Sequence, residues 1–298
     1  MGIKWQDNGY EVVITADGSP SLRSLSIPTL ESMHHSGGAL SETESIYTPV
    51  FRQVLELIPQ ARFFSLGLGL GYNEWIWARE CLLSGDGSAE TAQGSGSAAI
   101  PSRRSRLVTV ESQDFLSQTF LKHLRSQEFS QEHQDLLERI CNKPSIQESC
   151  KKDILPTNVE ESPREIQEKT LPQQLNQFLS DASQVADWVL SGALDASWVN
   201  SYRGESFHGI LYDAFSAKTC PDLWSEEFLT LFLQKLAAPD CVFSTYASRG
   251  GLRRTLVQQG FRVFLRQGFQ GKRQSTYAVR GRFADPTFLT DIQKVHRP

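Results

Sequence analysis

Hydrophobic positions follow two alternating periods along most of the chain. Short apolar runs of strand length lie at 63–66, 107–110, 207–212, 242–246, 261–265 and 275–279. Segments with apolar residues at helical spacing lie at 43–58, 72–83, from about 113, and at 185–194, 226–236 and 252–259. Because strands that alternate with helices build a largely parallel sheet, this pattern predicts an α/β fold with helices on both faces of the sheet.

Three segments depart from this rhythm. Residues 10–30 predict a small β element, in which a strand at 10–14 leads into the hairpin-turn dipeptide Asp17-Gly18. Residues 84–105 are rich in Gly, Ser and Ala, and residues 143–172 are polar with four prolines, so both are expected to be flexible insertions. We therefore expect residues 1–60 to pack on the core as a β element and helix, and residues 61–298 to form the ligand-binding domain.

A glycine-rich loop follows the first strand of the predicted sheet. In "LGLGLGYNE", Gly67, Gly69 and Gly71 separate a strand from a helix. Glycine allows the backbone to turn tightly and to approach a ligand, and the helix N-terminus presents free N–H groups to it. A dinucleotide fingerprint would need a glycine at Tyr72. The GxGxG pattern instead suits a site for S-adenosyl-L-methionine (SAM), and the alternative is a turn without a ligand.

Two acidic residues lie where a nucleoside-binding fold uses them. Glu111 ends the next strand, where a carboxylate can accept hydrogen bonds from ribose hydroxyls. It lies 44 residues after Gly67, about twice the usual spacing of ~20, and the 22-residue insertion at 84–105 accounts for the excess. Asp181 precedes the predicted helix at 185–194. We expect it either to reach the adenine amino group or to cap that helix.

A buried strand at 207–212 ends in the carboxylate of Asp213. The carboxyl ends of strands face the ligand crevice in open α/β sheets, so Asp213 is the first candidate for a catalytic residue. Tyr246, at the end of the next strand, is the second. Phe215 and Trp224 are candidates for an apolar wall. The alternatives are a turn-stabilising role for Asp213 and a plain core position for Trp224.

These motifs resemble the methyltransferase domain of the MnmC family, which completes the methylaminomethyl group on the wobble uridine of certain tRNAs. The resemblance rests on "LGLGLGYNE", "LYDAFSAKTCPDLWSEEF", "TYASRGGLRRTLVQQGF", "GFQGKRQ" and the opening segment "PTLESMHHSGGALSETESIY". It covers about residues 28–280, apart from the two insertions. Ala217 and Cys220 replace the Pro and Asn that are usual in the family signature.

The resemblance implies a Rossmann-like class I SAM-dependent methyltransferase, with a mixed seven-stranded sheet and helices on both faces. It implies SAM as the cofactor, tRNA as the partner and a stand-alone form that lacks the oxidase domain, so a separate oxidase would supply the aminomethyl group. The cofactor-binding residues would be Gly67, Gly69, Gly71, Glu111, Asp181 and Glu31. The catalytic residues would be Asp213 and Tyr246. The substrate-binding residues would be Phe215, Trp224, Arg253, Arg254, Lys272 and Arg273.

The charge distribution changes this picture in one region. The net charge of −4 argues against a general nucleic-acid binder, but residues 249–282 contain nine Lys or Arg and no Asp or Glu. This segment, which includes Arg253, Arg254, Lys272 and Arg273, is interpreted either as a phosphate-binding patch or as a solvated basic surface.

The remaining composition bounds the cellular setting. The five cysteines are scattered, with no CxxC pair, which indicates reduced thiols and a cytoplasmic protein. No apolar run reaches the length of a membrane span, so we expect no membrane association. His34 and His35 are adjacent and cannot share the face that helical metal sites use, so we expect no metal.

Two further functions stay open. A polyamine aminopropyltransferase shares the glycine loop, the ribose-binding acid and an acidic strand end, and it also acts on amines. A non-catalytic protein that binds SAM or RNA is the third possibility, because Ala217 and Cys220 depart from the family signature at the substrate side.

Overall fold

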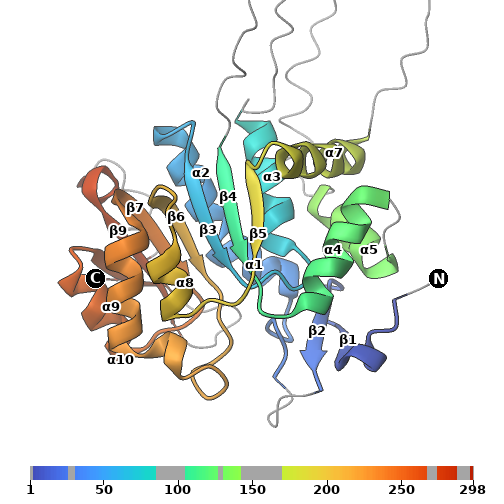
Figure 1. Cartoon of the computed structure of the whole chain (residues 1–298), viewed down its shortest axis with the longest axis horizontal. Helices are drawn as coiled ribbons and strands as arrows, with labels where there is room; N and C mark the ends of the chain where they lie inside the picture. Colours follow the sequence, from blue (N-terminus) through green and yellow to red (C-terminus); the bar gives the residue numbers. More distant parts are fainter. Residues whose placement is uncertain are drawn as a thin grey trace, which may run out of the picture.

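One mixed sheet of eight strands forms the centre of the computed structural model, with helices on both of its faces (Figure 1). The structure describes residues 3–25, 31–84, 105–126, 130–141, 170–266, 274–286 and 296–297. The strand order is β10-β8-β9-β7-β6-β3-β4-β5. The strands are β3 (Arg62–Leu66), β4 (Arg106–Val110), β5 (Trp188–Ser191), β6 (Phe207–Tyr212), β7 (Ala237–Thr245), β8 (Arg262–Arg266), β9 (Ser275–Arg280) and β10 (His296–Arg297). Because β10 has only two residues, seven strands carry the sheet, and the predicted fold class is confirmed.

The sheet changes its direction of growth between β3 and β6. Strands β3 to β7 are parallel, whereas β9 runs antiparallel to both β7 and β8. The chain extends the sheet from β3 through β4 to β5, and then returns to place β6 on the other side of β3. In open α/β sheets a ligand crevice forms at such a reversal, outside the carboxyl ends of the strands.

Successive residues of each strand point into two separate hydrophobic layers. Phe63, Leu211 and Val242 lie in the layer with α2, α3 and α7, while their neighbours Phe64 and Phe243 lie in the layer with α8, α9 and α10. The helices are α1 (Ala39–Ile46), α2 (Thr48–Leu57), α3 (Tyr72–Leu83), α4 (Asp114–Ser126), α5 (Gln131–Cys141), α7 (Leu171–Gln184), α8 (Ala196–Ser201), α9 (Glu226–Leu236) and α10 (Gly250–Gln258). None of these described helices is both long and apolar enough to cross a bilayer.

The N-terminal segment forms the predicted β element. Strands β1 (Tyr10–Ile14) and β2 (Pro20–Ser24) pair in an antiparallel hairpin around Asp17-Gly18. The Asp17 carboxylate accepts hydrogen bonds from the backbone N–H of Ser19 at 3.0 Å and of Ser41 at 2.9 Å. This carboxylate therefore fastens the hairpin to the first turn of α1.

The single helix expected at 43–58 is divided in two at Tyr47. Pro49, which has no backbone N–H, lies at the beginning of α2. The carbonyl groups exposed by the break accept hydrogen bonds from the Arg266 guanidinium, at 3.2 Å to both Ser45 and Ile46. The break is thus held by the far end of the sheet, and it directs the Tyr47 side chain inward, with 2% exposed.

The prediction of a helix at 185–194 is wrong. The helix of this region is α7, which ends before Ala186, a residue with a positive φ of 57°. Residues 188–191 then form β5, paired in parallel with β4. Trp188 is buried, and its indole N–H donates to the Thr109 hydroxyl at 3.1 Å. The apolar residues at 185–194 thus belong to a short strand and the loops on either side of it, and their spacing resembles that of a helix. Most of the insertions predicted at 84–105 and 143–172 lies outside the described residues.

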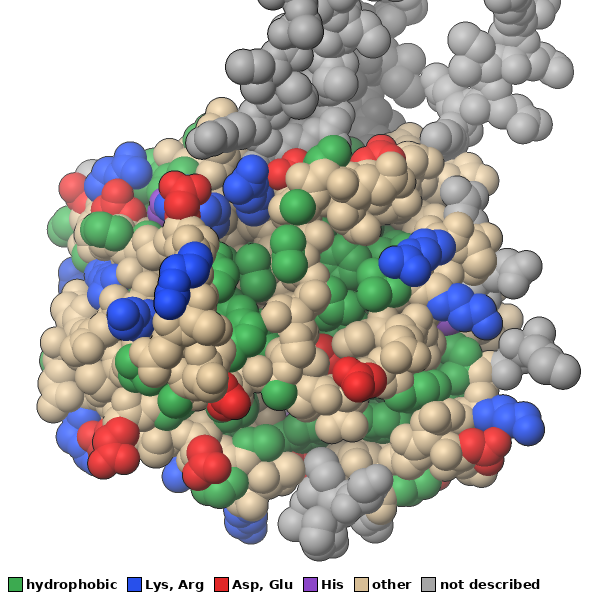
Figure 2. Space-filling view, viewed as in Figure 1, with side chains coloured by type: hydrophobic (Ala, Val, Ile, Leu, Met, Phe, Trp, Pro, Cys, Tyr) green, Lys and Arg blue, Asp and Glu red, His purple; other side chains and the backbone are tan. Residues whose placement is uncertain are grey.

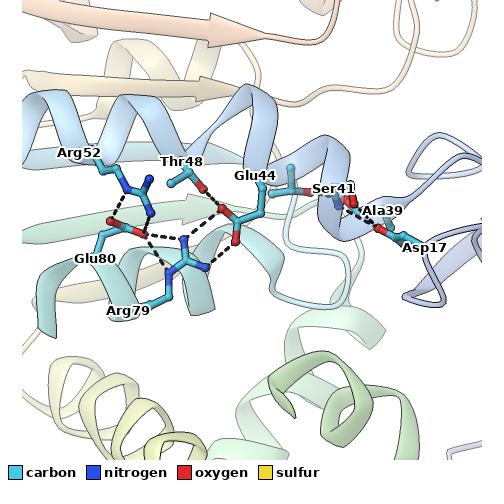
Figure 3. A network of polar contacts seen from close by, with 9 residues as sticks. Asp17, Ala39, Ser41, Glu44, Thr48, Arg52, Arg79 and Glu80 are labelled. Carbon is cyan, nitrogen blue, oxygen red and sulfur yellow. Dashed lines mark hydrogen bonds and ion pairs between the residues drawn. The ribbon is translucent and has the colours of Figure 1, made fainter. Parts of the chain in front are cut away.

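A buried ion-pair network joins α1 and α2 to α3 (Figure 3). Arg79 is 1% exposed and binds Glu44 and Glu80, each at 2.5 Å. Arg52 completes the network at 2.8 Å from Glu80, and the Thr48 hydroxyl donates to Glu44 at 2.7 Å. Because α3 begins at the glycine loop, this network fixes that loop relative to the α1–α2 break.

Arg79→Met is expected to lower the free energy of unfolding by about 3–5 kcal/mol, because it removes the buried cation between Glu44 and Glu80, and Arg52 pairs with Glu80 but not with Glu44 in the network. Arg52→Met is the matched control. Its side chain is 55% exposed, so its loss is expected to cost less than about 1 kcal/mol. Urea denaturation of both variants measures the difference, and equal losses would contradict the prediction.

Candidate functional site

A large cavity of about 1150 Å³ lies at the carboxyl ends of β3, β4 and β6. Its lining residues come from 31–47, from 66–73 around the glycine loop, from 110–112 at the end of β4, from 193–196 after β5 and from 213–231 after β6, together with Tyr246. Ligand pockets commonly measure about 300–1,000 Å³. The cavity therefore has room for a nucleoside-sized cofactor and for the reacting group of a second substrate.

The glycine loop contributes two of its three glycines to the cavity wall. Gly67 and Gly69 line the cavity with φ of 88° and 54°. A Cβ added at Gly67 would lie 3.3 Å from the Asp213 carbonyl oxygen, so the loop runs directly beside the end of β6. Gly71 has φ of 84°, but a Cβ there would lie 2.1 Å from a Phe120 ring carbon. Gly71 therefore lies where α3 packs against α4, and it is not among the residues that line the cavity.

Glu111 lies where the sequence predicts it, at the end of β4 in the cavity wall. One carboxylate oxygen accepts the Leu68 N–H at 2.9 Å, and the other accepts the Gln113 N–H at 2.8 Å. A carboxylate has about four acceptor positions, so both oxygens keep capacity for ribose hydroxyls. Glu111 thus joins the glycine loop to β4, and the position fits a ribose.

Asp181 does not reach this cavity. It lies in the last turn of α7, where it accepts a hydrogen bond from the Gln177 side chain at 2.7 Å. Neither of its expected positions applies, because the helix that it was expected to precede is β5. The acidic residue that lines the corresponding wall is Asp195, after β5, which caps α8 through the Trp198 N–H at 2.7 Å.

Asp213 lines the cavity beside the glycine loop. The cavity exposes part of the side chain, while protein surrounds it on its other sides. This burial raises the pKa of Asp213 to about 7. The Tyr47 hydroxyl opposes the rise and Glu42 adds to it. The carboxyl group therefore changes its protonation state near neutral pH, which suits a residue that exchanges a proton with an amine.

Tyr246 stands next to Asp213 in the same wall. Its hydroxyl donates to the Ala214 carbonyl at 2.9 Å, and burial together with the negative charge of Asp213 raises its pKa. The phenol therefore stays neutral, and its oxygen retains acceptor capacity.

Phe215 lines the cavity, but Trp224 does not. Trp224 is core, with 6% exposed, and its indole N–H donates to the Phe215 carbonyl at 2.7 Å, so it supports the wall from behind.

Residues 31–35 close the opposite side of the cavity. The Glu31 carboxylate accepts the backbone N–H of Ser216 at 3.0 Å and the hydroxyl of Thr219, so it fastens this segment to the loop after β6. His34 bonds to the Ser21 hydroxyl at 2.9 Å, and burial lowers its pKa to about 4. His35 accepts the Gly37 N–H at 2.9 Å. Within the described part of the chain, no group of His, Cys, Asp or Glu side chains is arranged to hold a metal ion.

Acidic side chains dominate the charged residues that line the cavity. No Lys or Arg occurs among its described lining residues. The acidic lining residues are Glu31, Glu42, Glu111, Asp195, Asp213, Asp222 and Glu227. Such a wall favours a cationic ligand and opposes a phosphate group.

Much of the basic C-terminal segment is occupied by internal contacts. Arg254 pairs with Glu226 at 2.5 Å and Arg282 with Asp240 at 2.7 Å. Arg266 is buried, and the half-buried Arg280 donates to the carbonyl of Ala237 at 2.6 Å. On the face in Figure 2, Lys and Arg are scattered, with Asp and Glu between them.

Of the four predicted phosphate-binding residues, the two that the structure describes lie outside the cavity lining. Arg253 and Arg254 belong to α10, outside the lining. Lys272 and Arg273 lie outside the described residues.

Two cavity residues that face Asp213, Glu42 and Tyr47, were not among the predicted site residues, although both belong to the opening segment that carries the family resemblance. They belong to α1 and to the break after it, yet they face Asp213, more than 160 positions further along the chain. The only local signal was the proline at position 49, which predicts a helix start two residues after Tyr47.

Comparison with known proteins agrees with the geometry of the cavity. Residues 164–281 match a family described as S-adenosyl-L-methionine-dependent methyltransferase. The tRNA 5-methylaminomethyl-2-thiouridine biosynthesis bifunctional protein MnmC of Azoarcus sp. is 42% identical over 96 residues, which cover 32% of this chain and 13% of that protein. MnmC of Hahella chejuensis is 39% identical over 67 residues, which cover 22% of this chain and 10% of that protein. MnmC proteins are thus homologues of this chain, which spans only a small share of their length.

A solved structure shares the fold. MnmC2 from Aquifex aeolicus superposes with a TM-score of 0.56 and 20% identity, over 91% of this chain and 70% of that chain.

Gly71→Ala is expected to destabilise the protein more than Gly260→Ala. Both glycines have a positive φ, 84° and 79°, but a Cβ at Gly260 meets no atom within 4 Å. Gly260→Ala therefore measures the backbone strain alone, about 1–2 kcal/mol. The Phe120 clash adds about 1–3 kcal/mol at Gly71. Urea denaturation gives both values, and equal losses would show that Phe120 moves aside without cost.

Proposed function

We propose that this SAM-dependent methyltransferase methylates a primary amine, the aminomethyl group of a modified wobble uridine in tRNA. The observation that carries the proposal is the position of Asp213, whose backbone oxygen approaches the glycine loop and whose carboxyl group lines the cavity. The homology to MnmC supports the tRNA uridine as the acceptor. A separate oxidase would then supply the aminomethyl group.

The residues of the cavity fit SAM on one side. The backbone of Gly67 and Gly69 would lie against the cofactor, Glu111 would bind the ribose, and residues 193–195 would border the base. SAM supplies a methyl group that the sulfonium has already activated. The protein then has to place the acceptor nitrogen in line with that methyl group and to manage the proton of the amine.

Asp213 would accept that proton. A primary amine is largely protonated at neutral pH, and its lone pair is then unavailable. With its pKa raised to about 7 by burial, Asp213 is a stronger base than an ordinary carboxylate and can take a proton from the ammonium group. The acidic wall around it attracts the cationic form of the substrate into the cavity.

Asp213→Asn is expected to lower kcat/KM by roughly a hundredfold or more and to change the pH profile. In the wild type the carboxyl group is protonated below about pH 7, so kcat/KM should fall as the pH falls through this value. The variant should lack this limb. Asp222→Asn, an exposed acid of the same wall, is the control and should keep it. A limb near pH 7 that persists in Asp213→Asn would exclude Asp213 as the base.

A second candidate function is transfer to a small polyamine, as in an aminopropyltransferase. The observation that favours it is the cavity itself, in which seven acids and no Lys or Arg line the described wall. An RNA phosphate would be repelled there, so a tRNA acceptor has to extend only its modified base into the cavity.

Two measurements separate the candidates. Calorimetry with SAM and with decarboxylated SAM is expected to show tighter binding of SAM, and the reverse preference would favour aminopropyl transfer. Methylation assays with tRNA carrying 5-aminomethyl-2-thiouridine and with spermidine then identify the acceptor. The expected result is a higher kcat/KM for the tRNA. Transfer to spermidine alone would overturn the proposed acceptor.

A further inference from the structure

The hydroxyl of Tyr47 is a buried polar group that faces both the cavity and Asp213. The residue is 2% exposed and lines the cavity. Within the described residues, its hydroxyl has no hydrogen bond of standard geometry. It nevertheless faces Asp213 closely enough that each group shifts the pKa of the other. A phenol that donates its hydrogen to Asp213 keeps acceptor capacity on its oxygen, so an N–H group of a ligand in the cavity is a suitable further partner.

The position of Tyr47 is built into the fold. The residue ends α1 and precedes α2, and the two carbonyls before it are held by Arg266 and by the Ser244 hydroxyl at 2.8 Å. These contacts fix the backbone from which the Tyr47 side chain projects into the cavity wall. Tyr246 approaches from the other side, but its proton is already donated to Ala214.

We propose that the Tyr47 hydroxyl oxygen and the carbonyl oxygen of the Asp213 carboxyl group together hold the two N–H groups of the neutral acceptor amine, and that Tyr47 thereby limits the reaction to one methyl group. This inference rests on the proposed function for its acceptor, and it adds the residue that determines the product. With both N–H groups held, the remaining lone pair of a neutral primary amine points away from the two oxygens, towards the place of the methyl donor.

The transfer begins with the amine in its protonated form. Asp213 first takes one proton from the ammonium group. The nitrogen lone pair then forms the new N–C bond while the C–S bond breaks, and the electron pair of that bond stays with sulfur. The product leaves as a secondary ammonium ion, and the proton on Asp213 returns to solvent.

A second methylation would require the new methyl group to take the place of one N–H. A hydrogen-bonded oxygen lies about 2.9 Å from the nitrogen, which leaves no room between them for a methyl carbon. A secondary amine also has a single N–H, so one oxygen would remain unpaired in a buried site. Tyr47→Phe removes the oxygen and opens space for the methyl group.

The experiment counts methyl groups on tRNA that carries 5-aminomethyl-2-thiouridine, by mass spectrometry of its nucleosides after prolonged incubation with SAM. The wild type is expected to add one methyl group. Tyr47→Phe is expected to add a second one and to lose up to roughly tenfold in kcat/KM through the missing hydrogen bond. Tyr202→Phe, whose hydroxyl bonds to Glu205 outside the cavity lining, is the control and should behave as the wild type. A Tyr47→Phe enzyme that still stops at one methyl group overturns the proposal.

A binding measurement decides the case in which the wild type does not methylate this tRNA. Calorimetry then uses 1,3-diaminopropane as the probe, with the enzyme saturated with S-adenosylhomocysteine. Binding that is at least fivefold weaker in Tyr47→Phe than in the wild type and Tyr202→Phe supports the role of Tyr47, while the tRNA proposal alone fails. Equal affinities, or no binding to the wild type, overturn the role of Tyr47.

Discussion

The close approach between the glycine loop and the end of β6 is the constraint on which the site depends. The two strands β3 and β6 are neighbours at the point where the sheet reverses its direction of growth, so their loops diverge and leave the cavity between them. A side chain at Gly67 would press on the Asp213 backbone. Glycine at this position therefore lets the glycine loop and the segment after β6 line one cavity. The remaining parts, from the α1–α2 break to the ion-pair network of Arg79, keep the two walls in place.

Features with a local cause could be predicted from the sequence. The hairpin at Asp17-Gly18, the helix at 72–83 and the strand that ends in Asp213 depend on neighbouring residues, and the structure contains them. Features that depend on distant partners could not be predicted. Nothing near Tyr47 indicates that it faces Asp213, and nothing near Arg266 indicates that a basic residue in a basic segment is buried against the carbonyls of α1. Gly67 and Gly71 look alike in the sequence, although one faces the cavity and the other faces Phe120.

The acidic wall and the basic segment bear on the substrate in different ways. The acids belong to four separate parts of the sequence, at positions 31 and 42, at 111, at 195, and at 213, 222 and 227, and the fold gathers these parts around one cavity. The basic residues are close together in the sequence, but the fold uses several of them as internal partners of carbonyls and carboxylates. Folding thus concentrates negative charge and disperses positive charge. The acidic lining favours a cationic group of a ligand over a phosphate group.

The link between Arg266 and the α1–α2 break has a consequence for the order of assembly. Arg266 lies 221 and 220 positions after Ser45 and Ile46, whose carbonyls it binds. The glycine loop and Glu111 both belong to the first 111 residues, and they can meet as soon as β3 and β4 pair. The contacts of Arg266 with the α1–α2 break cannot form before the chain has been synthesised as far as Arg266. The backbone before Tyr47 therefore gains these contacts only after most of the chain has been synthesised, and contacts between such distant positions slow folding.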